Sequence, residues 1–482
     1  MKRGRGGDAA PSPRLALRGR FAHGKVGAPG SLELVPDGLL VVAEDGTIES
    51  FSTSPEDVAA TLTALVQSGT PVYVLDGAEF CAPGMIDTHV HAPQYQFTGT
   101  ATDLPLMQWL QHYTFPAERR MADVALAGEV YARLVRRLIA HGTTTAVYFG
   151  SIHLEATKVL VDACRQQGQR AFVGKVAMDQ HGAPGYEETT ESSLKNTESL
   201  IEYCHACEPG VKAPVNRLVN PVITPRFIPT CSKALLHGLG ALAVKYRNSG
   251  CWVQSHCAES MDEMAFVESL HPGMRDTALF DAAGLLTDRC IMAHCVHLSD
   301  SELKLFAERK AGIACCPLSN AFFAHGNFGL QRALQYDARV GLGTDVAGGY
   351  SPSMLSSCRH AVVASMHRKS AGHQASGGAA VAGASEAVDW KVAFWTATLG
   401  GAAALGLEAH LGSFAPGKQF DAAIITSAAD VYDTFLPPSS AAMSPEAILA
   451  ADLERYVNLG DDRNVGKVFV RGRIVKGLGM CA

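Results

Sequence analysis

Residues 83–94 read PGMIDTHVHAPQ, and two histidines in this stretch, His89 and His91, flank a single valine. Met85 and Ile86, which precede them, are typical of a buried strand. Residues two apart on a strand point to the same side, so both imidazoles can face one metal ion. Neutral imidazole is a good ligand for zinc. The pair alone also fits two incidental polar histidines, so the interpretation depends on partners elsewhere in the chain.

Three more metal-competent side chains stand at the carboxyl ends of short apolar runs. His256 ends CWVQSH, His294 ends CIMAH and Asp345 ends VGLGTD. Eight such runs follow one another, separated mostly by helical segments: Gly84 to His89, Thr143 to Phe149, Ala171 to Ala177, Pro221 to Arg226, Cys251 to His256, Cys290 to His294, Gly312 to Cys316 and Val340 to Asp345. Eight alternations of strand and helix predict an α/β fold, a (β/α)8 TIM-type barrel with a parallel inner sheet.

The first helix predicted for this barrel ends at Gly142, which stands where a C-terminal cap belongs. Its apolar residues recur at helical spacing: Val130, Leu134, Val135, Leu138 and Ile139. Active sites of such barrels lie at the carboxyl ends of the strands. Five side chains that are distant in sequence are therefore expected to meet at the mouth of the barrel: His89, His91, His256, His294 and Asp345.

The chain exceeds the ~250 residues of a bare barrel, and its two ends show a different pattern. Residues 14–80 and 406–482 contain short alternating runs, several broken by Asp-Gly pairs that signal β-hairpins. We predict that both ends form one small β-sandwich domain, the second with closing helices, beside a barrel of residues 81–405. Residues 1–13 are expected to be a basic flexible tail, and the glycine-rich residues 371–385 a flexible surface loop.

Composition limits the classes of function. The 482 residues carry a formal net charge of −6 and are 47% hydrophobic, so they can bury a large core and suggest no surface for nucleic acid. No apolar run reaches the ~20 residues of a membrane span. The basic N-terminus lacks the apolar segment of a secretory signal, and its prolines and glycines disfavour a mitochondrial presequence. The 13 cysteines are scattered, and many lie within apolar strands, which suits reduced thiols in a cytoplasmic protein.

Together these residue types predict a hydrolytic metal centre. Three nitrogens and one oxygen would hold one zinc ion, supplied by His89, His91, His256 and Asp345. Water in the remaining position would be acidified towards a pKa of ~7. Glu259 could be an ordinary loop carboxylate, but three residues after His256 it could also deliver a proton to a substrate nitrogen. His294 would hold the hydroxide or the developing alkoxide.

Several longer motifs resemble the guanine deaminases of the amidohydrolase superfamily. They cover about residues 70 to 472 and include PGMIDTHVHAPQYQFTGTATDLPLMQWLQHYTFPAE, EVYARLVRRLIAHGTTTAVYF, VITPRF, GLGTDVAGGYSPSML and LGDDRNVGKVFVRG. The resemblance implies zinc-dependent hydrolysis of guanine to xanthine and ammonia, in purine catabolism or salvage, by a homodimer. It also implies the same four zinc ligands, with the catalytic roles falling to Glu259, His294 and Asp345.

The same resemblance implies which residues contact the substrate. Gln94 would read the purine edge, while Arg226 and Phe227 would contact the purine beside His256 and Glu259. Physical chemistry agrees, because a guanidinium donates to a carbonyl such as guanine O6 and a phenyl ring packs on a flat base. Binuclear members of the superfamily often carry a carboxylated lysine at the end of strand 4. Arg226 cannot become a bridging carbamate, which favours one zinc ion per chain.

The sequence departs from the resembled family near strand 7. That strand commonly ends in His-Cys-Pro followed by polar residues, whereas here Cys315 replaces the histidine and Leu318 a polar residue. Neither belongs to the expected ligands, so activity should survive. We expect an altered substrate preference at the pocket wall near this strand.

Two alternatives remain open at this point. The first is a related amidohydrolase that deaminates another aminopurine, an aminopyrimidine or a triazine, although the TPRF and DLPLMQWL motifs favour guanine. The second is a non-catalytic, dihydropyrimidinase-like scaffold. Such a protein would have little need of four metal ligands and two proton-transfer candidates, and all six are present.

Overall fold

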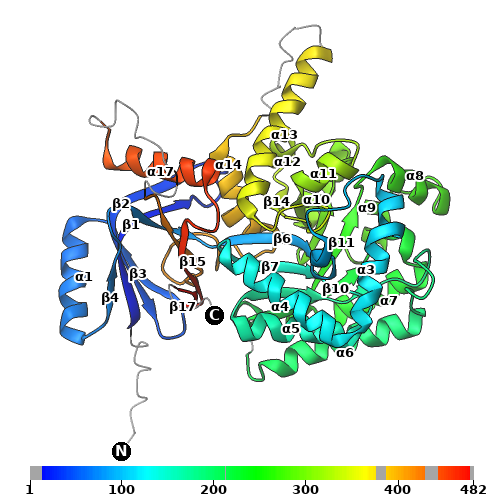
Figure 1. Ribbon diagram of the computed structural model, residues 1–482, viewed down its shortest axis with the longest axis horizontal. Helices are drawn as coiled ribbons and strands as arrows, with labels where there is room; N and C mark the ends of the chain where they lie inside the picture. The colour runs from blue at the N-terminus through cyan, green and yellow to red at the C-terminus, as the bar shows by residue number, and fades with distance from the viewer. Residues whose placement is uncertain (1–12, 212, 376–386, 429–431, 433–442, 478–482) are drawn as a thin grey trace, which may run out of the picture.

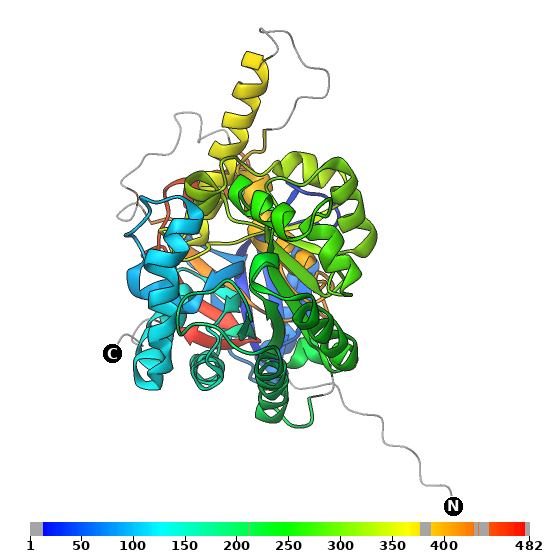
Figure 2. The same cartoon turned by 90° about the vertical axis from the view of Figure 1, so that its right-hand side faces the viewer.

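The computed structural model describes residues 13–211, 213–375, 387–428, 432 and 443–477. A barrel surrounded by helices lies beside a smaller sheet (Figure 1). The view turned by 90° shows helices arranged around the barrel strands (Figure 2). The predicted combination of an α/β barrel with a small β-domain is therefore confirmed.

The barrel sheet has the strand order β14-β13-β12-β11-β10-β8-β7-β6, and β9 pairs with β10. Every pairing in it is parallel. The Thr88 hydroxyl donates to the carbonyl of Leu342 at 2.8 Å, which joins the first strand to the last. The strands are β6 Met85–His91, β7 Thr143–Phe149, β8 Arg170–Gly174, β9 Val176–Ala177, β10 Val219–Pro225, β11 Trp252–Cys257, β12 Cys290–His294, β13 Gly312–Cys315 and β14 Arg339–Leu342.

Two of the predicted runs differ from the strands that form. The run predicted over Ala171 to Ala177 is divided at Lys175 into β8 and β9. The run predicted to end at Asp345 leaves the sheet after Leu342. Asp345 has a φ of 48°, a left-handed conformation that a strand cannot accommodate. This metal-competent carboxylate therefore lies on a turn beyond the last strand.

Helix α4 Val124–Ala140 forms as the sequence predicts. The Asp123 side chain caps its first turn by accepting from the backbone N–H groups of Ala125 and Leu126. The chain leaves the helix at Gly142 with a φ of 83°, which glycine adopts without steric cost. The apolar stripe packs into the barrel core through Val130, Leu134, Val135, Leu138 and Ile139.

The other helices alternate with the strands or cover the ends of the barrel. None of them, within the part of the chain that the structure describes, is long and apolar enough to span a membrane. Their bounds are α1 Pro55–Ser68, α2 Leu106–Trp109, α3 Phe115–Arg119, α5 Leu154–Gln167, α6 Thr190–Cys207, α7 Lys233–Tyr246, α8 Met261–Leu270, α9 Asp276–Ala282, α10 Asp300–Arg309, α11 Pro317–Phe323, α12 Leu330–Gln335, α13 Met354–Ala375, α14 Trp390–Trp395, α15 Gly401–Ala404 and α17 Pro445–Leu459.

Both ends of the chain contribute strands to the smaller sheet, whose order is β17-β16-β15-β5-β1-β2-β3, with β4 paired to β1. Residues from both ends share one apolar core, in which Phe21 and Leu40 meet Phe420 and Phe469. The strands are β1 Pro13–Gly24, β2 Leu32–Ala43, β3 Ile48–Ser52, β4 Val72–Val74, β5 Glu79–Pro83, β15 Ala422–Thr426, β16 Val465–Val470 and β17 Arg473–Lys476.

Some local predictions at the periphery are wrong or untested. The Asp45-Gly46 pair makes the expected turn between β2 and β3, but Asp37-Gly38 lies inside β2, where Gly38 pairs with Gly19. The loop predicted over residues 371–385 is wrong at its start, because α13 continues to Ala375. Residues 376–385 lie outside the described residues, as do residues 1–12 of the predicted tail.

Candidate active site

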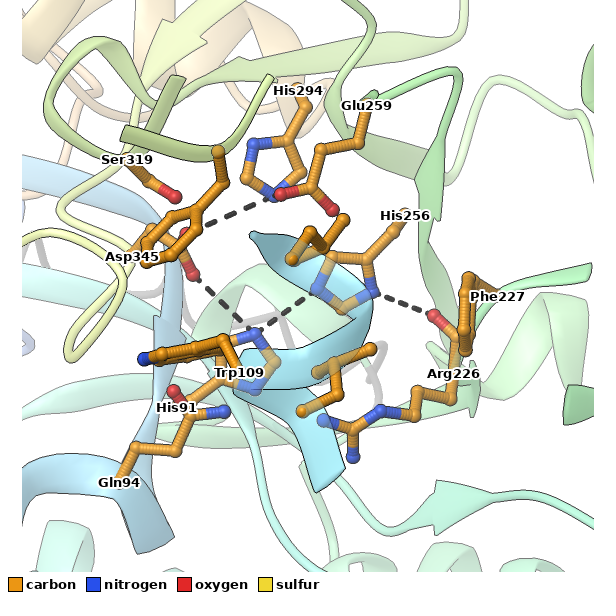
Figure 3. Close-up of a pocket in the computed structure, with 13 residues that line it drawn as sticks. His91, Gln94, Trp109, Arg226, Phe227, His256, Glu259, His294, Ser319 and Asp345 are labelled. Carbon is orange, nitrogen blue, oxygen red and sulfur yellow. Dashed lines mark hydrogen bonds and ion pairs between the residues drawn. The ribbon is translucent and has the colours of Figure 1, made fainter. Parts of the chain in front are cut away.

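The four predicted ligands converge at the mouth of the barrel, and Figure 3 shows three of them, His91, His256 and Asp345. The Nε2 atoms of His91 and His256 are 3.1 Å apart. Asp345 Oδ1 lies 3.0 Å from His89 Nε2 and 3.4 Å from His91 Nε2. The three imidazoles form a group whose ligand atoms all lie within 4.8 Å of one another. Residues from β6, β11 and the turn after β14 are thus brought to one point, as expected from their positions at strand ends.

The hydrogen-bonding state of these histidines fits a metal ion. His89 Nε2 is buried and has no hydrogen-bond partner, because its contact with Asp345 does not have the direction of a hydrogen bond. His256 Nδ1 donates to the backbone carbonyl of Arg226 at 2.6 Å, which leaves the Nε2 lone pair directed at the centre. Burial lowers the pKa of His89, His91 and His256 well below the ordinary value, so all three are neutral ligands.

The segment that carries Asp345 is held by a buried carboxylate of the first barrel strand. Asp87 Oδ1 accepts from the backbone N–H groups of Thr344 and His89, and Asp87 Oδ2 accepts from the Thr344 hydroxyl at 2.6 Å. The Asp345 N–H then donates to the carbonyl of His89 at 2.9 Å. These bonds join β6 to the last turn and place the Asp345 carboxylate among the histidines.

Cys316 is a further candidate ligand, through its sulphur atom, that the sequence analysis did not identify. Its thiol forms a group with nitrogens of His89 and His294 within 4.8 Å. Burial, followed by the charge of Asp345, raises the pKa of the Cys316 thiol well above its ordinary value. Because only the thiolate is a strong ligand, the three neutral imidazoles and Asp345 are the more favourable set.

The two predicted proton-transfer groups face each other on the opposite side of the pocket from Gln94 and Arg226 (Figure 3). His294 Nε2 lies 3.6 Å from Glu259 Oε1 and 3.8 Å from Asp345 Oδ2. His294 Nδ1 is 2.9 Å from Asn320 Oδ1, so it carries a proton and donates to that amide oxygen. Burial, then the charge of Asp345, raises the pKa of Glu259 well above its usual range. Glu259 can therefore be a protonated acid near neutral pH.

The predicted substrate contacts also line this pocket, whose wall includes Gln94, Arg226 and Phe227. The sequence analysis did not identify Glu118, the residue that binds two of these contacts from outside the pocket. Glu118, on α3, is fully buried. Its carboxylate pairs with both terminal nitrogens of Arg226, at 2.6 and 3.1 Å, and accepts from the Gln94 amide at 3.0 Å. The only sequence signal was its position at the end of the motif DLPLMQWLQHYTFPAE, because nothing local shows what it contacts.

Apolar side chains form much of the remaining pocket wall, and the sequence predicted only Phe227 among them. Trp109, on α2, lies across the pocket from Arg226 (Figure 3), and its ring is 4.9 Å from that of Phe323. The other apolar lining residues are Leu106, Leu110, Phe227 and Phe323. A pocket that combines apolar walls with convergent polar groups suits a flat heterocycle.

The two departures near strand 7 do not lie on the pocket wall where we expected an effect on substrate preference. Cys315 and Leu318 are both buried, and neither is among the residues that line the pocket. The neighbouring Ser319 lines it instead. Neither residue can therefore alter substrate preference by contacting the substrate directly.

A family model described as the amidohydrolase family matches residues 80–475. The chain therefore belongs to the amidohydrolase family. It is 39% identical to the guanine deaminase of Mus musculus, with 97% of this chain and 98% of the relative covered. It is 37% identical to that of Dictyostelium discoideum, with 93% and 95% covered.

A solved structure of a guanine deaminase from C. acetobutylicum, with guanine bound in its active site, superposes with a TM-score of 0.82 at 32% identity. The match covers 96% of this chain and 100% of that one. The resemblance to guanine deaminases that the sequence motifs predicted is thus confirmed.

Proposed function

We propose that this chain is a guanine deaminase that uses one zinc ion to hydrolyse guanine to xanthine and ammonia. The observation that carries the proposal is the convergence of three neutral imidazoles and a carboxylate beside Glu259 and His294, in a pocket with Arg226 and Gln94 on its other side. Full-length similarity to guanine deaminases supports the choice of substrate.

We propose that His89, His91, His256 and Asp345 would hold the zinc ion, which supplies Lewis-acid activation of the attacking water. The buried and unpartnered Nε2 of His89 supports this assignment, because an unsatisfied buried nitrogen is costly unless a ligand takes it up. With Arg226 at the end of the fourth barrel run there is no lysine to bridge a second ion there, which supports one zinc ion per chain.

Glu259 would transfer the protons of the reaction. Its raised pKa keeps the carboxyl protonated in the buried pocket, where it can donate that proton to a ring nitrogen. The resulting carboxylate would then take the proton of the new hydroxyl group at the attacked carbon and deliver it to the departing amine. His294 would donate from Nε2, when protonated, to the oxygen that develops negative charge at the attacked carbon. Asn320 supports that role by accepting from Nδ1, which keeps the ring oriented with Nε2 towards the pocket.

Arg226 and Gln94 would select the purine. A guanidinium only donates, so it matches the carbonyl at C6 of guanine and opposes the amino group at C6 of adenine. A buried donor left facing that amino group costs about 1–3 kcal/mol, and more when the donor is charged. Phe227 and the apolar wall would pack on the faces and edges of the flat ring.

The direct test is the rate of ammonia release from guanine, adenine, cytosine and a triaminotriazine by purified protein, before and after treatment with a chelator. We expect guanine alone to be turned over rapidly, activity to disappear with the chelator, and added zinc to restore it. Rapid turnover of another ring and none of guanine would contradict the proposal. Full activity in protein shown by metal analysis to be free of metal would contradict the zinc centre.

Two further parts of the proposal concern the cell. We propose that the enzyme acts as a homodimer in the cytoplasm, in purine catabolism or salvage, as the sequence resemblance implies. Light scattering on purified protein tests the dimer, and fractionation of cells that express it tests the compartment.

A further inference from the structure

Glu118 accepts hydrogen bonds at both carboxylate oxygens, and the donors come from three separate segments. Oε1 accepts from Gln94 Nε2 and Arg226 Nη2, and Oε2 accepts from Arg226 Nη1 and from the Tyr186 hydroxyl at 2.7 Å. A carboxylate has about four acceptor positions, so these four bonds saturate it. Tyr186, Gln94 and Arg226 are all buried with it.

The carboxylate fixes which atoms Arg226 presents to the pocket. Both terminal nitrogens of Arg226 are bound by Glu118, and the Arg226 guanidinium carbon lies 4.9 Å from the centre of the Phe115 ring. Without a negative partner, a buried guanidinium would be strongly destabilised. With one, the guanidinium keeps a single orientation, and its remaining N–H groups are free to donate to substrate.

The same carboxylate fixes the polarity of the Gln94 amide. Gln94 Nε2 donates to Glu118, and Gln94 Oε1 accepts from the Ala347 N–H at 3.2 Å, so the amide cannot be turned over without losing both bonds. One N–H and one lone pair of the amide remain for a ligand. The wall therefore offers donors from Arg226 and both a donor and an acceptor from Gln94. A carbonyl beside a ring N–H matches this pattern.

We propose that Glu118 is a positioning residue that sets Arg226 and Gln94 to read the 6-oxo edge of the purine, and so determines substrate choice. This inference rests on the proposed function. Because its own acceptor positions are filled, Glu118 offers nothing to an exocyclic amine at C6. It acts on specificity through its two neighbours and not by touching the substrate.

The test compares the inhibition constants of hypoxanthine, which has the 6-oxo edge, and of unsubstituted purine, which lacks it. Neither carries the amine that guanine loses. In the unchanged protein we expect hypoxanthine to bind roughly 10- to 100-fold more tightly, the usual value of hydrogen bonds from a charged donor. In Glu118→Gln we expect this preference to fall to about 3-fold or less, with the zinc content unchanged. If Glu118 had a purely structural role, its replacement would raise both inhibition constants by the same factor and leave their ratio unchanged.

Glu188→Gln is the matched control. Glu188 pairs with the fully buried Lys175 outside the pocket lining, so the same substitution removes a carboxylate from a buried cation. We expect it to lower stability and to leave the preference for hypoxanthine unchanged. A loss of preference in this variant equal to that in Glu118→Gln would overturn the inference, since any buried charge would then matter equally.

A double-mutant comparison keeps the test valid if Glu118→Gln alone does not fold. The variant Glu118→Gln with Arg226→Met removes both charges and leaves neither ion unpaired. A glutamine at 118 can still accept from Gln94, so the double variant should match Arg226→Met in its preference within about 2-fold. A further loss of roughly 10-fold relative to Arg226→Met would show that Glu118 does not act through Arg226. If the unchanged protein does not deaminate guanine, the proposed function fails; if it does and Glu118→Gln keeps its preference, only this inference fails.

Discussion

Replacement of Glu259 by glutamine separates proton transfer from folding and from metal binding. The residue is 6% exposed, and its carboxyl Oε1 lies 3.6 Å from His294 Nε2, beyond the range of a strong hydrogen bond. Glutamine has nearly the same size, so we expect a change in unfolding free energy of less than about 1 kcal/mol. Loss of a general acid–base group lowers kcat by ~10²- to 10⁴-fold, equivalent to about 3–5 kcal/mol of transition-state stabilisation.

The assay measures guanine absorbance under saturating substrate, with zinc content and thermal unfolding measured on the same preparation. Glu263→Gln is the matched control, because Glu263 is a buried carboxyl four residues away that does not line the pocket. It accepts from the Glu259 N–H at 2.6 Å, and a glutamine oxygen can do the same. We expect this control to keep most of the activity. If zinc content falls in step with kcat in Glu259→Gln, Glu259 is a ligand or a structural group and the reasoning is refuted.

Three other predictions concern the metal, the substrate and pH. Asp345→Ala should lose tightly bound zinc and nearly all activity, because the oxygen ligand is removed; a zinc-loaded, active variant would contradict the ligand assignment. Arg226→Met should reduce kcat/KM for guanine by at least about 10-fold, and steady-state rates on adenine should stay negligible in the unchanged enzyme. Burial raises the pKa of Asp87 to about 7, so the stability of chelator-treated protein should fall as pH rises from about 4 to about 7, by up to about 4 kcal/mol. Asp87→Asn, which stays neutral, should remove the share of that fall that comes from Asp87 in denaturant titrations, and an unchanged pH dependence would contradict it.

The barrel and its strand-end histidines could be predicted because their signals are local. The alternation of apolar runs and helical segments is present in the sequence whatever the packing, and parallel strands place their carboxyl ends together. For the same reason His89, His91, His256 and His294 could be expected at one mouth. The sequence showed the apolar run that ends in Asp345. It did not show the turn that places the Asp345 carboxylate beside His89.

Glu118 shows what the sequence alone could not supply. It stands 108 residues from Arg226 and 68 from Tyr186, and each of its hydrogen bonds joins segments that meet only in the folded chain. The residues around it indicate only a short helix with a proline near its start. The polarity of the Gln94 amide was equally hidden, because it depends on the Ala347 N–H, 253 residues away.

The amino-acid sequence by itself therefore determined the class of fold, the metal-competent residues and the family resemblance, all of which depend on residue type and short-range spacing. Only the tertiary structure decided which hydrogen bonds orient those residues. Burial then sets the chemistry, because it keeps three histidines neutral, favours a protonated Glu259 and makes the Arg226 cation depend on Glu118. Burial and orientation are properties of distant segments packed together, and a linear sequence does not display them.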